Sequence, residues 1–397
     1  MQRRTFLSFG ATCAGLGSLP FSSQVIAAGG QTAPRFLLVF LRGGYDAMNL
    51  LVPASSFYQE VRPHIALPMA TADKPGAIRL TDQWGLHPAA EAPLRGLLQA
   101  RQISFVPFAG TDDTSRSHFE TQDSIELGQA TGSPKNFQSG FLNRLAAALN
   151  GGSAMSFTDQ LPTVFRGPID IANVSLKTNS KKGLDQSTQS ALADMYRHHP
   201  LGAKINEGFE ARKELSMDMA EEMEAASRHA ASANAFEQEA RKMARLMRDR
   251  HTIGFVDIGG WDTHVGQGQL EGYLPSRLAQ LASGLAGFAE EMGSSWKQTT
   301  VLVISEFGRT MRENGNRGTD HGHGTVYWAL GGGLAGQAVL GEQTTVEART
   351  LFQNRDLPVL NDYRSLLGGL LQRQYGLSSS AIDTVFPGSK PKDIGLI

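Results

Sequence analysis

The chain has 397 residues, with 37 basic and 38 acidic side chains, ten histidines and one cysteine. Its length allows a large core, built as one big domain or as one domain with an insertion. The balanced charge, without a strong basic patch, argues against nucleic acid and against a membrane surface as partners. Beyond the N-terminal segment no apolar run approaches about 18 residues, so we expect no stable membrane insertion.

The first 28 residues have the layout of an export signal. Arg3 and Arg4 precede a weakly apolar run rich in small residues, and VIAA at 25–28 offers small residues to a signal peptidase. We interpret 1–28 as a twin-arginine signal peptide; an ordinary Sec signal is the alternative, because both share this layout. The prediction is a periplasmic or secreted bacterial protein that meets the twin-arginine translocase during export.

Cleavage of that signal would remove two of the 37 basic residues, leaving 35 against 38 acidic ones, a net charge of −3. It would also remove Cys13, the only cysteine. Residues 29–397 would then contain neither a disulfide nor a thiolate. Any metal ion must therefore be held by carboxylate, imidazole, hydroxyl or carbonyl groups.

Short apolar runs alternate with segments of helical spacing along the rest of the chain. This alternation predicts an α/β fold with a doubly wound, mostly parallel sheet and a helical insertion at about 184–251. The expected strands open or fill 35–53, 103–110, 161–167, 253–264, 299–310 and 327–341. The expected helices lie at 91–102, 117–128, 140–150, 274–293 and 362–376.

Unusual polar residues follow several of these strands. Asp46 follows the first, Ser117 and His118 the second, Asp262 and His264 the strand at 253, and Glu306 the strand at 299. In open parallel sheets, ligands bind at the carboxyl ends of the strands. We therefore expect these side chains to share one edge of the sheet.

The stretch TDHGHGT at 319–325 adds Asp320, His321 and His323. Two histidines spaced by one residue can point the same way in an extended segment, and the glycines allow close backbone approach. We predict a site for one or two divalent ions, zinc above all, with manganese, magnesium or calcium as alternatives. Its predicted ligands are Asp46, Asp262, His264, Glu306, Asp320, His321 and His323.

Two such ions would activate a nucleophile and neutralise the leaving oxygen of an ester. Ser117 at a helix N-terminus is the expected nucleophile, with His118 beside it; Thr114 and Ser115 compete for that role. Arg309 is the third predicted catalytic residue, as a bidentate clamp for phosphate or sulfate, and Arg42 and Arg116 are alternatives. The structural alternatives are helix capping by Asp46, a capping box from Ser117 to Glu120, and surface ion pairs for the arginines.

Five motifs in order carry a resemblance: FLRGGYDAMNLLVP, SHFETQD, DIGGWDTH, SEFGRT and GTDHGHGT. Together they resemble the DUF1501 family, exported relatives of the alkaline phosphatase-like superfamily of phosphatases and sulfatases. The resemblance implies an alkaline phosphatase-like α/β sandwich with a two-metal site. By this resemblance Asp46 takes the place of the first-strand ligand, the Ser117 region that of the nucleophile, and Asp262 with His264 that of an Asp/His pair.

The chain departs from the superfamily pattern at Phe307. It has Glu306-Phe307-Gly308 where Asp-His-Gly is usual, and phenylalanine cannot ligate a metal. In another register Asp320-His321-Gly322 matches that motif, which leaves Glu306 outside the ligand set. The spacing from Asp262 to His264 is also shorter than usual.

The leading hypothesis is an exported metal-dependent hydrolase of a phosphate or sulfate ester, with a small-molecule or glycan ester as substrate. The main alternative is a non-catalytic envelope binding or assembly protein on the same fold. A metal-dependent hydrolase of a different bond is a third hypothesis, because ligands specify a metal better than a substrate.

Overall fold

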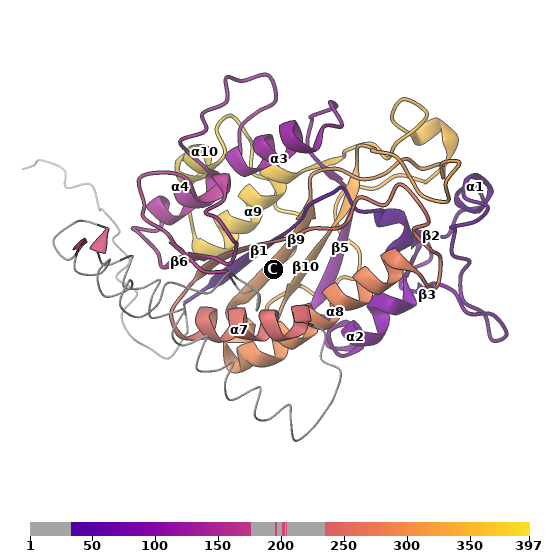
Figure 1. The fold of residues 1–397 in the computed structure, drawn as a ribbon, viewed down its shortest axis with the longest axis horizontal. Coiled ribbons are helices and arrows are strands. Elements are labelled where there is room, and N and C mark those ends of the chain that lie inside the picture. Colours follow the sequence, from indigo (N-terminus) through magenta and orange to yellow (C-terminus); the bar gives the residue numbers. More distant parts are fainter. Residues whose placement is uncertain (1–32, 176–194, 197–200, 203, 205–234) are drawn as a thin grey trace, which may run out of the picture. The chain divides into compact units, whose positions relative to one another are not determined.

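An eight-stranded sheet runs through the computed structural model of the protein (Figure 1). The structure describes residues 33–175, 195–196, 201–202, 204 and 235–397. Along the sheet the strands follow the order β11-β5-β10-β9-β1-β8-β6-β7. They are β1 (Arg35–Leu41), β5 (Ile103–Gly110), β6 (Ala154–Ser156), β7 (Ala172–Asn173), β8 (Ile253–Ile258), β9 (Thr299–Ser305), β10 (Thr325–Gly331) and β11 (Asn361–Asp362).

Neighbouring strands are parallel except around β10, which is antiparallel to both β5 and β9. The expectation of a mostly parallel α/β sheet is therefore confirmed, with one reversed strand. The expected strand at 161–167 is wrong, because Thr163–Phe165 form a 3-10 turn and Val164 and Phe165 pack into the core.

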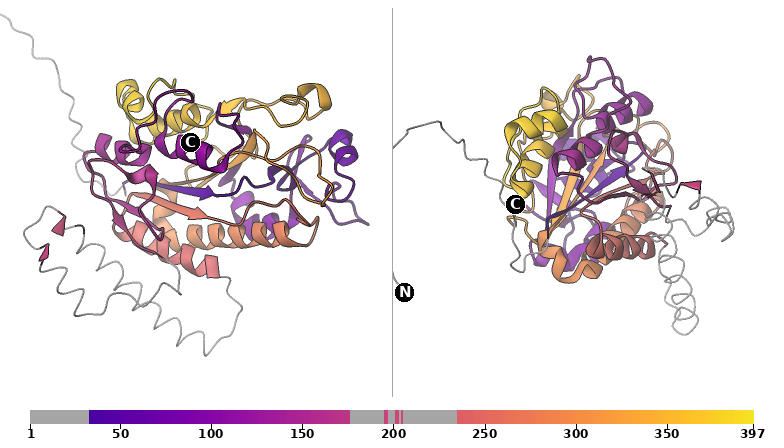
Figure 2. Two further views of the ribbon diagram at one scale, coloured as in Figure 1. Left: turned by 45° about the horizontal axis from the view of Figure 1, so that its top comes forward. Right: turned by 90° about the vertical axis from the view of Figure 1, so that its left-hand side faces the viewer.

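Helices cover both faces of the sheet, as Figures 1 and 2 show. Alternate residues of β1 point to opposite faces: Phe36 and Phe40 join one apolar cluster, and Leu37 and Val39 join the other. Burial on both faces explains why the strand is apolar from its second residue to its last. The Leu37 face carries α2 (Pro88–Gln99), α7 (Ala235–Asp249) and α8 (Tyr273–Met292). The Phe36 face carries α3 (His118–Leu127), α4 (Phe141–Ala148), α9 (Tyr363–Tyr375) and α10 (Ser379–Val385).

A second, three-stranded sheet lies beside the short helix α1 (Ser56–Val61) in Figure 1. It contains β2 (Leu51–Pro53), β4 (Trp84–Leu86) and β3 (Ile78–Arg79), paired antiparallel in that order. Further 3-10 turns are formed by Ala47–Asn49, Gly293–Gln298 and Ala348–Thr350. The sequence pattern did not predict these strands, because two or three residues are too few to show a period.

Ala33–Ile397 form one compact unit. The expected signal peptide at 1–28 lies outside the described residues, as does most of the expected helical segment at 184–251. The part of that segment that is described contains α7, which packs along α8. Across the described residues, no helix has both the length and the apolar character needed to cross a membrane.

Candidate metal centre

The predicted site residues meet at one edge of the large sheet because of strand direction. Leu41 of β1 lies level with Ile258 of β8 and Ser305 of β9, so the chain leaves these three parallel strands at the same height. β5 runs in the same direction, and α3 follows its carboxyl end. The reversed β10 begins at this edge, which brings the preceding TDHGHGT stretch to it.

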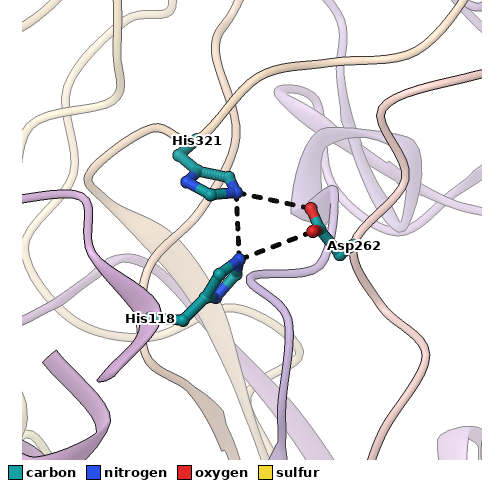
Figure 3. A group of neighbouring side chains, drawn as sticks. All are labelled: His118, Asp262 and His321. Carbon is teal, nitrogen blue, oxygen red and sulfur yellow. Dashed lines mark hydrogen bonds and ion pairs between the residues drawn. The ribbon is translucent and has the colours of Figure 1, made fainter. Parts of the chain in front are cut away.

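Three side chains from separate loops converge there, as Figure 3 shows. The Nε2 atoms of His118 and His321 are 2.9 Å apart. The Asp262 carboxylate lies 3.6 Å from His118 Nε2 and 3.4 Å from His321 Nε2. One ligand atom from each residue falls within 4.8 Å of the others, which is compatible with a shared metal ion.

His264 extends this group on the side of Asp262. Its Nε2 is 3.0 Å from Asp262 Oδ1 and 3.1 Å from His321 Nε2. About two fifths of the His264 and Asp262 side chains is exposed, so the group is open to solvent there. The metal group, as we name it, consists of His118, Asp262, His264 and His321.

The outer nitrogen of each histidine faces a hydrogen-bond acceptor. Nδ1 of His118 donates to Glu306 Oε1 at 2.8 Å, Nδ1 of His321 to the Arg116 carbonyl at 3.0 Å, and Nδ1 of His264 to Asp320 Oδ1 at 3.3 Å. With the proton on Nδ1, each neutral ring presents its Nε2 lone pair to the centre. Three lone pairs and a carboxylate facing one space form a donor set for a cation.

Glu306 holds the His118 ring in place through a hydrogen bond to Nδ1. Burial alone would raise the pKa of Glu306, but hydrogen bonds from His118 and Gln122, at 2.8 Å each, and from the Gly43 N–H lower it overall. The carboxylate therefore stays ionised, and its hydrogen bond raises the pKa of His118. These donors all bond to Oε1 of Glu306, and Ser305 Oγ donates to Oε2. Glu306, which was predicted to be a metal ligand, therefore orients a histidine instead.

Arg309 holds Asp262 in place. Its guanidinium donates to Asp262 Oδ1 and to the carbonyls of Gly43, Gly44 and Thr319, and its side chain is fully buried. Burial would raise the pKa of Asp262, but the hydrogen bond and charge of Arg309 lower it overall. The prediction that Arg309 clamps a substrate anion does not fit, because protein acceptors already occupy its donors.

The other two arginines weighed as clamps are also in ion pairs. Arg42 binds Asp257 at 2.6 Å and Glu126 at 2.8 Å. Arg116 binds the buried Asp356 at 2.6 Å. Both arginines are therefore in ion pairs, but with the buried carboxylates of Asp356 and Glu126 and not at the surface as the alternative expected.

Ser117 caps α3 with its backbone only. It occupies the N-cap position, but its side chain makes no capping hydrogen bond, so the expected capping box with Glu120 is absent. Among the described residues its hydroxyl has no hydrogen-bonded base, so activation of Ser117 as a nucleophile would depend on a bound metal ion. Ser115 instead bonds locally, its Oγ accepting from the Ser117 N–H at 3.3 Å.

Asp46 and His323 lie outside the metal group. Asp46 is fully buried and forms a two-pronged ion pair with Arg62, and Gln267 also donates to it at 2.6 Å. The His323 ring stacks on Phe352 with centroids 4.9 Å apart, and burial lowers its pKa. The prediction that Asp46 and His323 are metal ligands does not fit the structure, because other groups already hold their side chains.

Two contributions were not predicted. His118 was expected to act in catalysis, yet it places Nε2 among the ligand atoms. Phe307 packs on both His118 and His321, with ring centroids 4.9 and 5.1 Å away. The residue that breaks the superfamily motif thus forms the apolar wall behind two of the candidate ligands.

Arg116 positions His321 through its backbone. It is a non-glycine residue with φ of +55°, and its side chain is anchored to Asp356 at 2.6 and 2.9 Å and to Gln353 at 2.7 Å. A left-handed conformation is uncommon for such a residue and persists only when its surroundings hold it. This conformation aims the Arg116 carbonyl at His321 Nδ1.

We expect Asp356→Asn to weaken metal binding by about tenfold, since loss of a supporting residue around a metal ligand typically costs roughly 10–100-fold. The measurement is a competition titration against a chelating dye, with circular dichroism to verify folding. Asp393→Asn, which breaks the exposed pair with Arg373, is the matched control. Equal affinities of a folded Asp356 variant and the wild type would rule out this positioning role.

Comparison with known proteins gives one family match. Residues 105–386 match the family described as "Protein of unknown function (DUF1501)". No curated protein matches the sequence.

Solved structures of low similarity include a protein in the alkaline phosphatase superfamily from Vibrio parahaemolyticus (12 % identity, TM-score 0.35, covering 76 % of this chain and 61 % of that one). Another is the C-terminal periplasmic domain of EcEptC from Escherichia coli in complex with Zn (9 % identity, TM-score 0.35, covering 76 % of this chain and 73 % of that one). A third is the phosphonate monoester hydrolase SpPMH from Silicibacter pomeroyi (10 % identity, TM-score 0.35, covering 91 % of this chain and 76 % of that one). The chain thus spans about three fifths of the first neighbour's length, and TM-scores this low say nothing about activity.

Proposed function

This chain belongs to the DUF1501 family, and from that premise and the metal group we propose that it is a metal-dependent hydrolase of a phosphate or sulfate ester. One observation carries the proposal: the Nε2 atoms of His118 and His321 and the Asp262 carboxylate lie within 4.8 Å of one another, with His264 Nε2 beside the last two, and an acceptor holds each imidazole from behind. The ester class comes from the resemblance of the motifs.

The donor set fits zinc best. Nitrogen from imidazole and oxygen from one carboxylate suit zinc, whereas calcium and magnesium prefer oxygen ligands alone. His118, His264, His321 and Asp262 would hold the ion. A bound divalent ion would act as a Lewis acid that lowers the pKa of water and polarises an ester oxygen.

The chain's own residues prepare this site in three ways. Glu306 and Asp320 keep the protons of His118 and His264 on the outer nitrogens. Burial, the largest influence, lowers the pKa of His321, which favours its neutral, ligating form. Phe307 excludes water from one side of both partly exposed rings.

We propose one ion rather than two. The described residues offer one group of three or more candidate ligands, and Asp46 and His323 have other partners. Export through the twin-arginine pathway to the periplasm or beyond also remains a proposal, supported by the N-terminal sequence.

The test is hydrolysis of p-nitrophenyl phosphate and 4-methylumbelliferyl sulfate by zinc-loaded protein. We expect turnover that a chelator abolishes and that added zinc restores. An unrelated zinc-loaded protein serves as the blank for hydrolysis by free metal.

The competing function is a non-catalytic metal-binding protein. The enclosed Arg309 favours it, because the expected clamp for the substrate anion already binds protein acceptors. One tightly bound equivalent of zinc without hydrolysis of phosphate, sulfate, phosphonate or carboxylate esters would establish this function and reject the hydrolase.

A further inference from the structure

A cavity of about 880 Å³ lies beyond the carboxyl ends of β1, β6 and β8. Ligand pockets typically enclose about 300–1,000 Å³, so this cavity can hold a small organic molecule. Its walls come from the ends of these strands and from α3, α7 and α8. Lining residues include Arg42, Gln122, Phe157, Met243, Asp257 and Arg277.

The cavity adjoins the metal group on two sides. Gln122 accepts from Arg42 at 2.8 Å in the cavity wall and donates to Glu306 at 2.8 Å, and Glu306 in turn holds His118. On the other side, Arg277 donates to the carbonyl of Gly259 at 3.1 Å, in the loop that continues to Asp262.

Two arginines of the lining have no carboxylate partner among the described residues. Arg166 makes no side-chain hydrogen bond or ion pair there. Arg277 donates only to Gln280 and the Gly259 carbonyl, stacks on Tyr273, and leaves a buried Nε atom without a partner. Guanidinium groups without a counter-charge bind oxyanions through paired hydrogen bonds.

The rest of the lining contains carboxylates, amides and hydroxyls together with two aromatic rings. The Glu126 and Asp257 carboxylates are occupied by Arg42, and Asp159 accepts from Ser175 at 2.6 Å. Further donors and acceptors come from Thr158, Gln160, Thr163, Glu239 and Gln280. Phe157 and Phe236 add apolar surface. Amides, hydroxyls and carboxylates beside aromatic rings suit a ligand with many hydroxyl groups.

We infer that this cavity binds the saccharide portion of an acidic carbohydrate, with Arg166 and Arg277 holding an anionic substituent other than the group at the metal. The inference rests on the proposed function in so far as the carbohydrate is a substrate. The anion can be a sulfate or a carboxylate, because a guanidinium pairs with either.

The experiment is isothermal titration of the zinc-loaded protein with three hexasaccharides: a heparin-derived one that carries sulfates, hexagalacturonate that carries carboxylates, and neutral maltohexaose. We expect an acidic hexasaccharide to bind at least tenfold tighter than maltohexaose. In Arg166→Gln/Arg277→Gln this preference should fall by about tenfold or more, a difference of about 1.4 kcal/mol.

Arg349→Gln, at an exposed arginine paired with Glu347, is the control and should bind like the wild type. The sulfated and uronate arms identify the anion. Equal binding of acidic and neutral sugars, absence of binding, or an unchanged preference in the folded double variant would overturn the inference.

Titration separates this inference from the proposed function, because binding is read without turnover. Aryl ester hydrolysis without saccharide binding would reject the cavity and leave the hydrolase. Arginine-dependent saccharide binding without hydrolysis would support the cavity and reject the hydrolase.

Discussion

Zinc-loaded wild-type protein is expected to contain close to one equivalent of zinc, and His321→Ala close to none. His321 Nε2 lies within 3.4 Å of ligand atoms from each of the other three members of the metal group, so its loss opens the centre of the donor set. Affinity should fall by more than about a hundredfold, beyond the roughly 10–100-fold lost with a supporting residue. Elemental analysis after dialysis measures the content.

The loop itself supplies the matched control. His323 lies two residues away, but its ring packs on Phe352 and is only 7 % exposed. His323→Ala should therefore keep the zinc and lose about 1–3 kcal/mol of unfolding free energy, as expected for a buried, packed side chain. Loss of zinc from His323→Ala but not from His321→Ala would reverse the assignment of the two histidines.

Sequence patterns identify the long strands well and the short ones poorly. RFLLVFL and TTVLVIS contain the continuous apolar runs FLLVFL and VLVI because helices cover both faces of β1 and β9. LPTVFRG has similar apolar content, but it forms a turn whose Val164 and Phe165 fill a gap beside α4. An apolar run reports burial, and burial alone does not choose between an extended strand and a packed turn.

The direction of the strand that follows TDHGHGT was also not predicted from the sequence. The prediction for TDHGHGT treated it as a loop after the strand at 299, whereas its position depends on β10 entering the sheet in reverse. Both routes place the histidines at the same edge. The prediction of a shared edge was therefore sound, although the sequence did not show the reason.

The geometry of the candidate ligands was partly predictable for a physical reason. Asp262, His264 and His321 are separated from their strands by short glycine-containing loops, so strand order largely determines where they lie. For Asp46 and His323 the deciding partners are Arg62 and Phe352, which no local pattern connects to them. A carboxylate after a strand looks the same in sequence whether it meets a metal or an arginine.

Asp46→Asn should keep its zinc and lose about 3–5 kcal/mol of unfolding free energy. Asp46 and Arg62 are both fully buried and form two hydrogen bonds of 2.6 and 3.0 Å. Asparagine preserves the size of the side chain but leaves the Arg62 charge uncompensated, and breaking a buried pair on one side costs about this much. Urea unfolding measures the loss, and elemental analysis measures the zinc.

A double variant separates the missing charge from the missing side chain. Arg62 also donates to the carbonyls of Thr310 and Met311, so Arg62→Met alone should be strongly destabilising too. In Asp46→Asn/Arg62→Met neither charge remains, and the combined loss should be smaller than the sum of the two single losses. An additive result would mean that the pair contributes no coupling.

The zinc measurement on the same variants decides between the two roles of Asp46. A ligand would lose the metal on conversion to asparagine, even in a protein that stays stable. A structural anchor loses stability first and keeps the metal as long as the chain is folded, because Asp262 and the three histidines are unchanged. Zinc lost from folded Asp46→Asn would restore Asp46 to the ligand set and, with it, the case for a second ion.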